Sequence, residues 1–133
     1  MAATAQPTTS LVGPIGQIAL AVPDVAAAVR FYRDDLGFPL LFEAPPGLAF
    51  FDCGGIRLML SAPEQGQPAA PSTGAIYFRV ADIRAAHAAL VARGVKFEDE
   101  PHLVARMPDH ELWMCFVRDP GGNLLGLMAE VRQ

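Results

Sequence analysis

The chain has 133 residues, of which 52% are apolar and 18% are charged, and its formal net charge is −4 at pH 7. A chain of this length forms one domain with its own core, and no apolar run is long enough to cross a bilayer as a helix. The 10 basic residues form no cluster and are outnumbered by 14 acidic ones, which excludes the positive face that nucleic-acid binding requires.

The N-terminus and the two cysteines indicate a cytoplasmic protein. Residues 1–14 lack the charged segment and apolar block of a secretory signal. We predict that these residues form a disordered or frayed tail. Cys53 and Cys115 have no C-x-x-C spacing, which favours free thiols in a reducing compartment.

The first half of the chain, residues 15–61, begins with a strand in which Ile18, Leu20 and Val22 alternate with smaller or polar residues. Asp24 then suits a helix N-cap, and Gly37 stands where a left-handed C-cap is expected. The period afterwards returns to two, which predicts three further strands at residues 40–43, 48–51 and 56–61.

A linker rich in Pro, Gln and Ala, residues 62–73, precedes a second half with the same pattern. Residues 75–80 alternate as a strand, Asp82 is the expected N-cap, and Gly94 is the expected C-cap of the second helix. Three strands are predicted to follow at residues 97–104, 110–118 and 124–130.

The two halves are a weak internal repeat. Gly16, Val22 and Asp24 match residues 58 positions later, and Asp52 and Gly54 match Asp119 and Gly121 at a shift of 67. The predicted architecture is therefore βαβββ, residues 15–61, followed by βαβββ, residues 74–131.

A single βαβββ unit has a helix on one face of its sheet and leaves the other face open. Two such units can cover their open faces by curving around a shared hollow. The predicted fold class is α+β, with two βαβββ repeats forming a curved mixed sheet around a central cavity that admits a small molecule.

The segments IALAVPDVAAAVRFYRDDLGF and FVRDPGGNLLGLM resemble the opening strand and helix and the closing hairpin of the vicinal oxygen chelate superfamily. This is the group of glyoxalases, bleomycin resistance proteins and extradiol dioxygenases, and the resemblance covers residues 16–131. It implies that fold and a homodimer. It does not fix an activity, because the group includes isomerases, epimerases, dioxygenases, thiol transferases and drug-sequestering proteins.

In metal-dependent members of that group, His, Glu or Gln side chains on four strands hold the ion. The resemblance places these slots on Gln17, Met59, Ala75 and Gly126. Methionine offers only a soft sulfur, and alanine and glycine have no donor. We therefore expect no metal at the usual place and no cofactor.

We expect a mostly apolar and aromatic wall with a few polar groups around the hollow. Tyr77 and Trp113 combine a flat ring with a donor, while Arg57 and Arg79 either bind an anion or pair with nearby acids. The candidate ligand-binding residues are Gln17, Phe50, Arg57, Met59, Tyr77, Arg79, Trp113 and Cys115.

These observations favour a protein that sequesters or presents a small, partly aromatic organic molecule. The alternative is a lyase, isomerase or oxygenase that uses metal-free acid–base chemistry or a divalent metal at a non-standard site. His102, His110 and Glu111 are the catalytic candidates, because a hairpin folded about Arg106 would place the two histidines opposite each other. Such residues also occur simply as surface or dimer contacts.

Overall fold

The computed structural model describes residues 11–63, 67–68 and 70–132. The expected N-terminal tail up to residue 10, and residues 64–66 and 69 of the expected linker, lie outside this part of the chain. Among the described residues, no helix is long and apolar enough to cross a membrane.

The structure contains the two predicted βαβββ repeats, here called module one (β1 to β4) and module two (β5 to β8). The strand orders are β1-β4-β3-β2 and β5-β8-β7-β6. The β1–β4 and β5–β8 pairs are parallel and the others antiparallel. The elements are β1 Gln17–Ala21, α1 Val25–Arg30, η1 Phe31–Asp35, β2 Leu40–Ala44, β3 Leu48–Cys53, β4 Ile56–Ser61, β5 Ala75–Arg79, α2 Ile83–Ala92, β6 His102–Arg106, β7 His110–Arg118 and β8 Leu124–Arg132.

The predicted helix ends are confirmed. The Asp24 carboxylate accepts a hydrogen bond from the backbone N–H of Ala27 at 3.1 Å, and Asp82 caps α2 in the same way. Gly37 and Gly94 have φ values of 86° and 92°, a conformation that costs glycine little. Each helix therefore starts and stops at residues visible in the sequence.

The first helix changes its hydrogen-bond pattern after Arg30. The sequence does not predict this change. Residues 31–35 form the π-helical segment η1, and the Leu36 N–H donates to the Phe31 carbonyl at 3.0 Å. This wider turn leaves both Phe31 and Tyr32 buried, with their rings edge to face at 5.2 Å. Such π-turns often position functional side chains.

The predicted strand at residues 97–104 is wrong in its bounds. Phe97 makes an isolated bridge to Val117, and β6 begins only at His102. Pro101 lacks a backbone N–H, and Asp99 uses its carboxylate to accept the backbone N–H of Phe116 at 2.8 Å. Residues 98–101 therefore run beside β7 without continuous pairing.

Each sheet has a helix-covered face and an open face. The α1 helix contacts β3 and β4, and α2 contacts β7 and β8. The core lies between helices and sheets and contains Leu20, Val22, Ala28, Val29, Phe31, Tyr32, Ala49, Phe51, Leu58, Leu60, Ile83, Leu90, Val95, Cys115, Val117, Leu125, Leu127 and Ala129.

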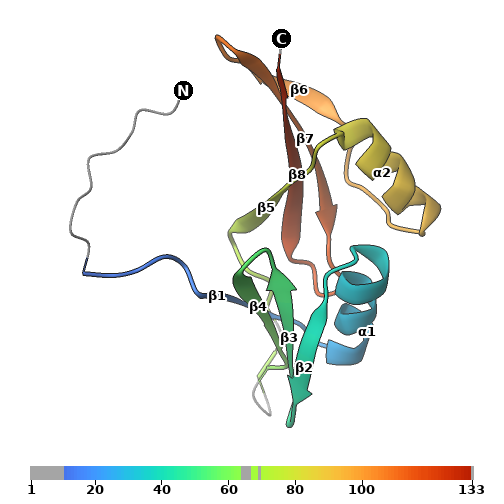
Figure 1. Ribbon diagram of the computed structural model, residues 1–133. Helices are drawn as coiled ribbons and strands as arrows, with labels where there is room; N and C mark the ends of the chain where they lie inside the picture. Colours follow the sequence, from blue (N-terminus) through green and yellow to red (C-terminus); the bar gives the residue numbers. More distant parts are fainter. Residues whose placement is uncertain (1–10, 64–66, 69, 133) are drawn as a thin grey trace.

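The two modules lie end to end, with α1 and α2 on the same side (Figure 1). The open face of each sheet consequently meets solvent in the single chain. Phe42 is 49% exposed on the first sheet and Tyr77 is 47% exposed on the second. An enclosed cavity on these open faces therefore requires another protein surface to cover them.

A buried polar network joins the modules. The Tyr32 hydroxyl donates to Asp119 at 2.7 Å, and Asp119, only 4% exposed, also accepts the backbone N–H groups of Gly121 and Asn123 and the Asn123 amide. The Asn123 amide further donates to the Ala21 carbonyl at 3.0 Å. Burial, reinforced by the Asp119 charge, raises the pKa of Tyr32 far above its usual value, so the hydroxyl remains a donor.

Candidate functional site

The open face of module one carries the polar candidates of the first half. The parallel register pairs Gln17 with Arg57 and Ala19 with Met59. Because alternate residues of a strand share a face, Gln17 and Ala19 on β1 and Arg57 and Met59 on β4 lie together. Four of the predicted ligand-binding residues, Gln17, Phe50, Arg57 and Met59, are thus brought into one cluster.

Arg57 is the centre of this cluster. Its Nε donates to the Gln17 side-chain oxygen at 2.8 Å, and the Gln17 amide nitrogen in turn donates to the Met59 sulfur at 3.8 Å. The Arg57 guanidinium carbon lies 5.6 Å from the centroid of the Phe50 ring, within the range of a cation–π contact. Its other N–H groups bond no other described residue. Because Arg has five donors, these groups are available to an anion.

Phe42 also belongs to this cluster, although the sequence does not indicate it. Its ring stacks on Phe50 with a centroid distance of 4.5 Å and an interplanar angle of 25°. A β-bulge shifts the β2 register between Leu40 and Phe42, so simple counting does not reveal the face of Phe42. Two stacked rings beside a guanidinium offer a flat surface with an adjacent positive charge.

The open face of module two is built around Gly126. The register places Tyr77 and Phe116 on either side of this glycine, and their rings meet edge to face at 5.9 Å. A Cβ at Gly126 would lie 2.7 Å from Tyr77 Cδ2 and 3.2 Å from Phe116 Cε1. Two aromatic rings therefore fill the space that a side chain at this position would need.

Arg79 lies two residues beyond Tyr77 on β5 and is exposed. Its side chain forms no hydrogen bond or ion pair with any other described residue, although its backbone belongs to the β5–β8 pairing. Of the two alternatives for Arg79, pairing with a neighbouring acid is not seen in this part of the chain, and its guanidinium is available to an external anion.

Comparison with known proteins agrees with this architecture. Residues 14–127 match the profile of the Glyoxalase/Bleomycin resistance protein/Dioxygenase superfamily. The chain belongs to this superfamily. The resemblance drawn from its opening and closing segments is thereby confirmed.

Among curated proteins, the chain is 32% identical over 126 residues to "Uncharacterized protein YraH" of Bacillus subtilis, and the match covers 82% of this chain and 92% of that protein. Among solved structures, a lactoylglutathione lyase from Agrobacterium tumefaciens is 26% identical with a TM-score of 0.71, covering 90% of this chain and 96% of that one. A glyoxalase/bleomycin resistance protein/dioxygenase from Nocardioides is also 26% identical, with a TM-score of 0.69, and covers 92% of this chain and 87% of that one.

The donor set does not fit the superfamily's metal. At the first of the four metal-ligand positions, the Gln17 side-chain amide is already bonded to Arg57 and Met59. Met59 supplies a soft sulfur, and Ala75 and Gly126 have no side-chain donor. At Gly126 the aromatic rings also exclude a longer side chain. These residues are unsuited to gripping a hard or borderline divalent cation.

Two predicted lining residues face the wrong side. Cys115 is fully buried in the core beneath α2, where burial raises the pKa of its thiol to about 11. Trp113 packs against the same core and lies under the Arg84 guanidinium at 5.1 Å. The prediction that both line the hollow is wrong, because β7 turns Met114 and Phe116, rather than Trp113 and Cys115, toward the open face.

The predicted pairing of His102 with His110 across a hairpin is also wrong. His102 pairs with Met114, whereas the His110 carbonyl accepts the backbone N–H of Met107 at 2.8 Å. The hairpin therefore turns about residues 107–110 instead of about Arg106.

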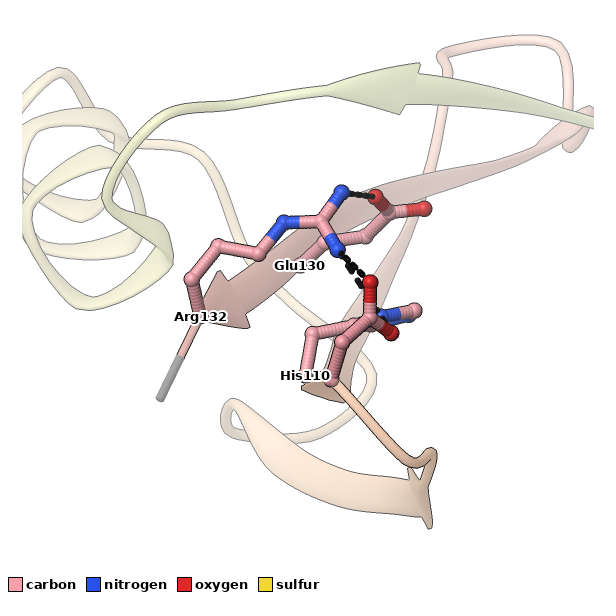
Figure 2. Close-up of polar contacts among 4 residues, drawn as sticks. His110, Glu130 and Arg132 are labelled. Atoms are coloured by element: carbon pink, nitrogen blue, oxygen red, sulfur yellow. Dashed lines mark hydrogen bonds and ion pairs between the residues drawn. The ribbon is translucent and has the colours of Figure 1, made fainter. Parts of the chain in front are cut away.

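His110 and Glu111 point to different partners. Figure 2 shows Arg132 between Glu130 and His110, with contacts of 3.1 Å and 3.3 Å, while the carboxylate of Asp109 bonds the His110 ring at 2.8 Å. Glu111 instead accepts the Trp113 indole N–H at 3.1 Å. Within the described ranges, no three His, Cys, Asp or Glu side chains gather closely enough to hold a metal.

Proposed function

We propose that the protein binds a small, partly aromatic organic anion on its open faces without a metal ion. The observation that carries this proposal is the Arg57 guanidinium, held by Gln17 beside the stacked Phe42 and Phe50 rings. A planar ligand would extend the aromatic stack, and its anionic group would take the free guanidinium donors.

Arg57→Ala is expected to weaken binding of 2-naphthoate about 10- to 100-fold, since a hydrogen bond to a charged group contributes about 1.5–3 kcal/mol. Isothermal titration of the full chain measures this change. The uncharged 2-naphthamide should bind more weakly and should respond little to the substitution.

Arg33→Ala is the matched control, because Arg33 is exposed and, among the described residues, its side chain pairs only with its neighbour Asp34. It should leave the dissociation constant of 2-naphthoate unchanged. Equal affinities of the original protein and Arg57→Ala, or no saturable binding of 2-naphthoate or any related planar anion, would refute the proposed function.

The second part of the proposal is that another copy of the chain closes the hollow. Phe42 and Tyr77 are each about half exposed on the open faces, and large exposed apolar side chains favour association. We further propose that this homodimer acts in the cytoplasm, where Cys53 and Cys115, both free in the structure, stay reduced.

Light scattering is expected to give twice the single-chain mass of 14.2 kDa, and Phe42→Arg is expected to shift the protein to single chains by placing a charge in the interface. Val91→Arg is the control, because Val91 has the same 49% exposure but lies on α2. A monomeric starting protein, or dissociation by Val91→Arg alone, contradicts a dimer closed through the open faces.

A further inference from the structure

A cleft lies between the two modules on the side of the helices, away from both open faces. Leu36 and Phe38, just after η1, and the Cys53–Gly54 turn form its module-one side, while β5 and α2 form the module-two side. Its volume is about 600 Å³, within the range of small-molecule sites. In Figure 1 the segment η1 points toward the C-terminal end of α2, and the hydrogen bond from Arg93 to the Asp35 carbonyl joins these two ends.

The walls of the cleft are mainly apolar. Phe38 of module one meets Phe78 of module two with ring centroids 5.0 Å apart, so the rings bridge the junction. The α2 helix turns Ala86, Ala89 and Leu90 toward the cleft, positions spaced to share one helix face. Because two of these three residues are alanines, the helix leaves space that longer side chains would fill.

The charge of the lining is positive. Among the described residues, its ionisable lining residues are Arg93, Cys53 and Arg79, and no carboxylate lines it. Arg79 shares the strand face of Tyr77, so Arg93 supplies the positive charge on the helix side. Burial raises the pKa of the Cys53 thiol to about 11, so this group is neutral at pH 7. Arg93 is the C-cap residue of α2, and its guanidinium donates to the Asp35 carbonyl at 2.7 Å. That bond fixes the guanidinium at the end of the cleft and leaves other N–H donors free.

We propose that this inter-module cleft is a second ligand site, for a medium-chain aliphatic monocarboxylate. The aliphatic chain would lie against Phe38, Phe78 and Leu90, and the carboxylate would bind the Arg93 guanidinium. This site is independent of the open-face site, since none of the Arg57 cluster lines the cleft.

Titration of the full chain with octanoate tests the charge requirement, with 1-octanol as the uncharged probe of equal chain length. Octanoate should bind saturably with one site per chain, and Arg93→Ala should weaken it at least tenfold while changing 1-octanol binding less than twofold. Arg57→Ala should leave octanoate binding unchanged. Absence of octanoate binding, or its loss in Arg57→Ala instead of Arg93→Ala, overturns the proposal.

Ala89→Leu tests the location, because the added side chain would occupy the cleft while leucine keeps a helix propensity close to that of alanine. It should reduce octanoate affinity at least tenfold. Ala88→Leu is the matched control, since Ala88 is exposed on α2 and does not line the cleft; it should bind octanoate normally.

Alkylation of Cys53 gives an independent readout of the same site. Cys53 borders the cleft, whereas Cys115 is fully buried. Saturating octanoate should slow the reaction of Cys53 with N-ethylmaleimide severalfold in the original protein and not in Ala89→Leu. An unchanged alkylation rate, or equal octanoate binding by Ala88→Leu and Ala89→Leu, places octanoate elsewhere and refutes the cleft site.

Discussion

Asp119→Ala is expected to lower the free energy of unfolding by at least about 3 kcal/mol. The carboxylate accepts hydrogen bonds from the Tyr32 hydroxyl, two backbone N–H groups and the Asn123 amide in a nearly solvent-free position. Each buried donor left without a partner costs about 1–3 kcal/mol. Denaturant unfolding followed by circular dichroism measures the loss. Tyr32→Phe removes one donor and should lower the free energy of unfolding by about 1–2 kcal/mol. This variant allows the test to be made if Asp119→Ala fails to fold.

The internal repeat provides the control for this substitution. Asp52 occupies the equivalent position in module one, near the end of β3, and is partly exposed. Among the described residues, its carboxylate accepts only the Gly55 backbone N–H, at 3.0 Å. Asp52→Ala should therefore cost less than about 1 kcal/mol. Equal losses for Asp52→Ala and Asp119→Ala would show that the Asp119 network does not hold the modules together.

Gly126→Glu should lower the free energy of unfolding by about 2 kcal/mol, the middle of the range for overpacked sites. The new Cβ would collide with the Tyr77 and Phe116 rings. Removing one of these rings should relieve the collision, so the double variant Gly126→Glu with Tyr77→Ala should recover at least about 1 kcal/mol relative to Gly126→Glu alone. A double-mutant cycle of denaturant unfolding measures this coupling.

Gly16→Glu is the control for Gly126→Glu, because it also replaces a glycine by glutamate but at a position without aromatic neighbours. A Cβ at Gly16 would meet no atom within 4 Å and its φ is not in the left-handed region, so the expected change lies within about 0.5 kcal/mol. Equal losses of unfolding free energy in Gly16→Glu and Gly126→Glu would contradict the view that aromatic packing keeps a carboxylate out of position 126.

Local residue chemistry made much of the fold predictable. The paired caps at Asp24 and Asp82 and the paired glycines at Gly37 and Gly94 act within one helical turn, so the sequence contains all the information that they need. The same holds for the alternation of β1 and β5, because each strand has one face against its helix.

The faces of β7 were harder to predict, because residues 112–117 are apolar throughout and show no alternation. The antiparallel register across the DPGG turn pairs Phe116 with Gly126 and Cys115 with Leu127. Once Gly126 is placed on the open face, Phe116 must lie there as well and Cys115 must lie in the core. Counting the residue pairs outward from the DPGG turn would have placed both Trp113 and Cys115 on the helix-covered face.

Long-range contacts were not visible in the sequence at all. Tyr32 and Asp119 are 87 positions apart. Neither the sequence around Tyr32 nor the DPGGN turn that contains Asp119 indicates their hydrogen bond. The inter-module cleft likewise depends on how the two repeats pack together, which no local pattern encodes.

The most direct test of metal-independent binding is titration of the chelator-treated protein with 2-naphthoate, first in excess EDTA and then after exchange into buffer with Mn²⁺, Ni²⁺ or Zn²⁺. We predict saturable binding in EDTA with a dissociation constant that changes less than twofold when a metal is added. Binding that appears only with a divalent ion, and that Gln17→Ala abolishes, would contradict the account.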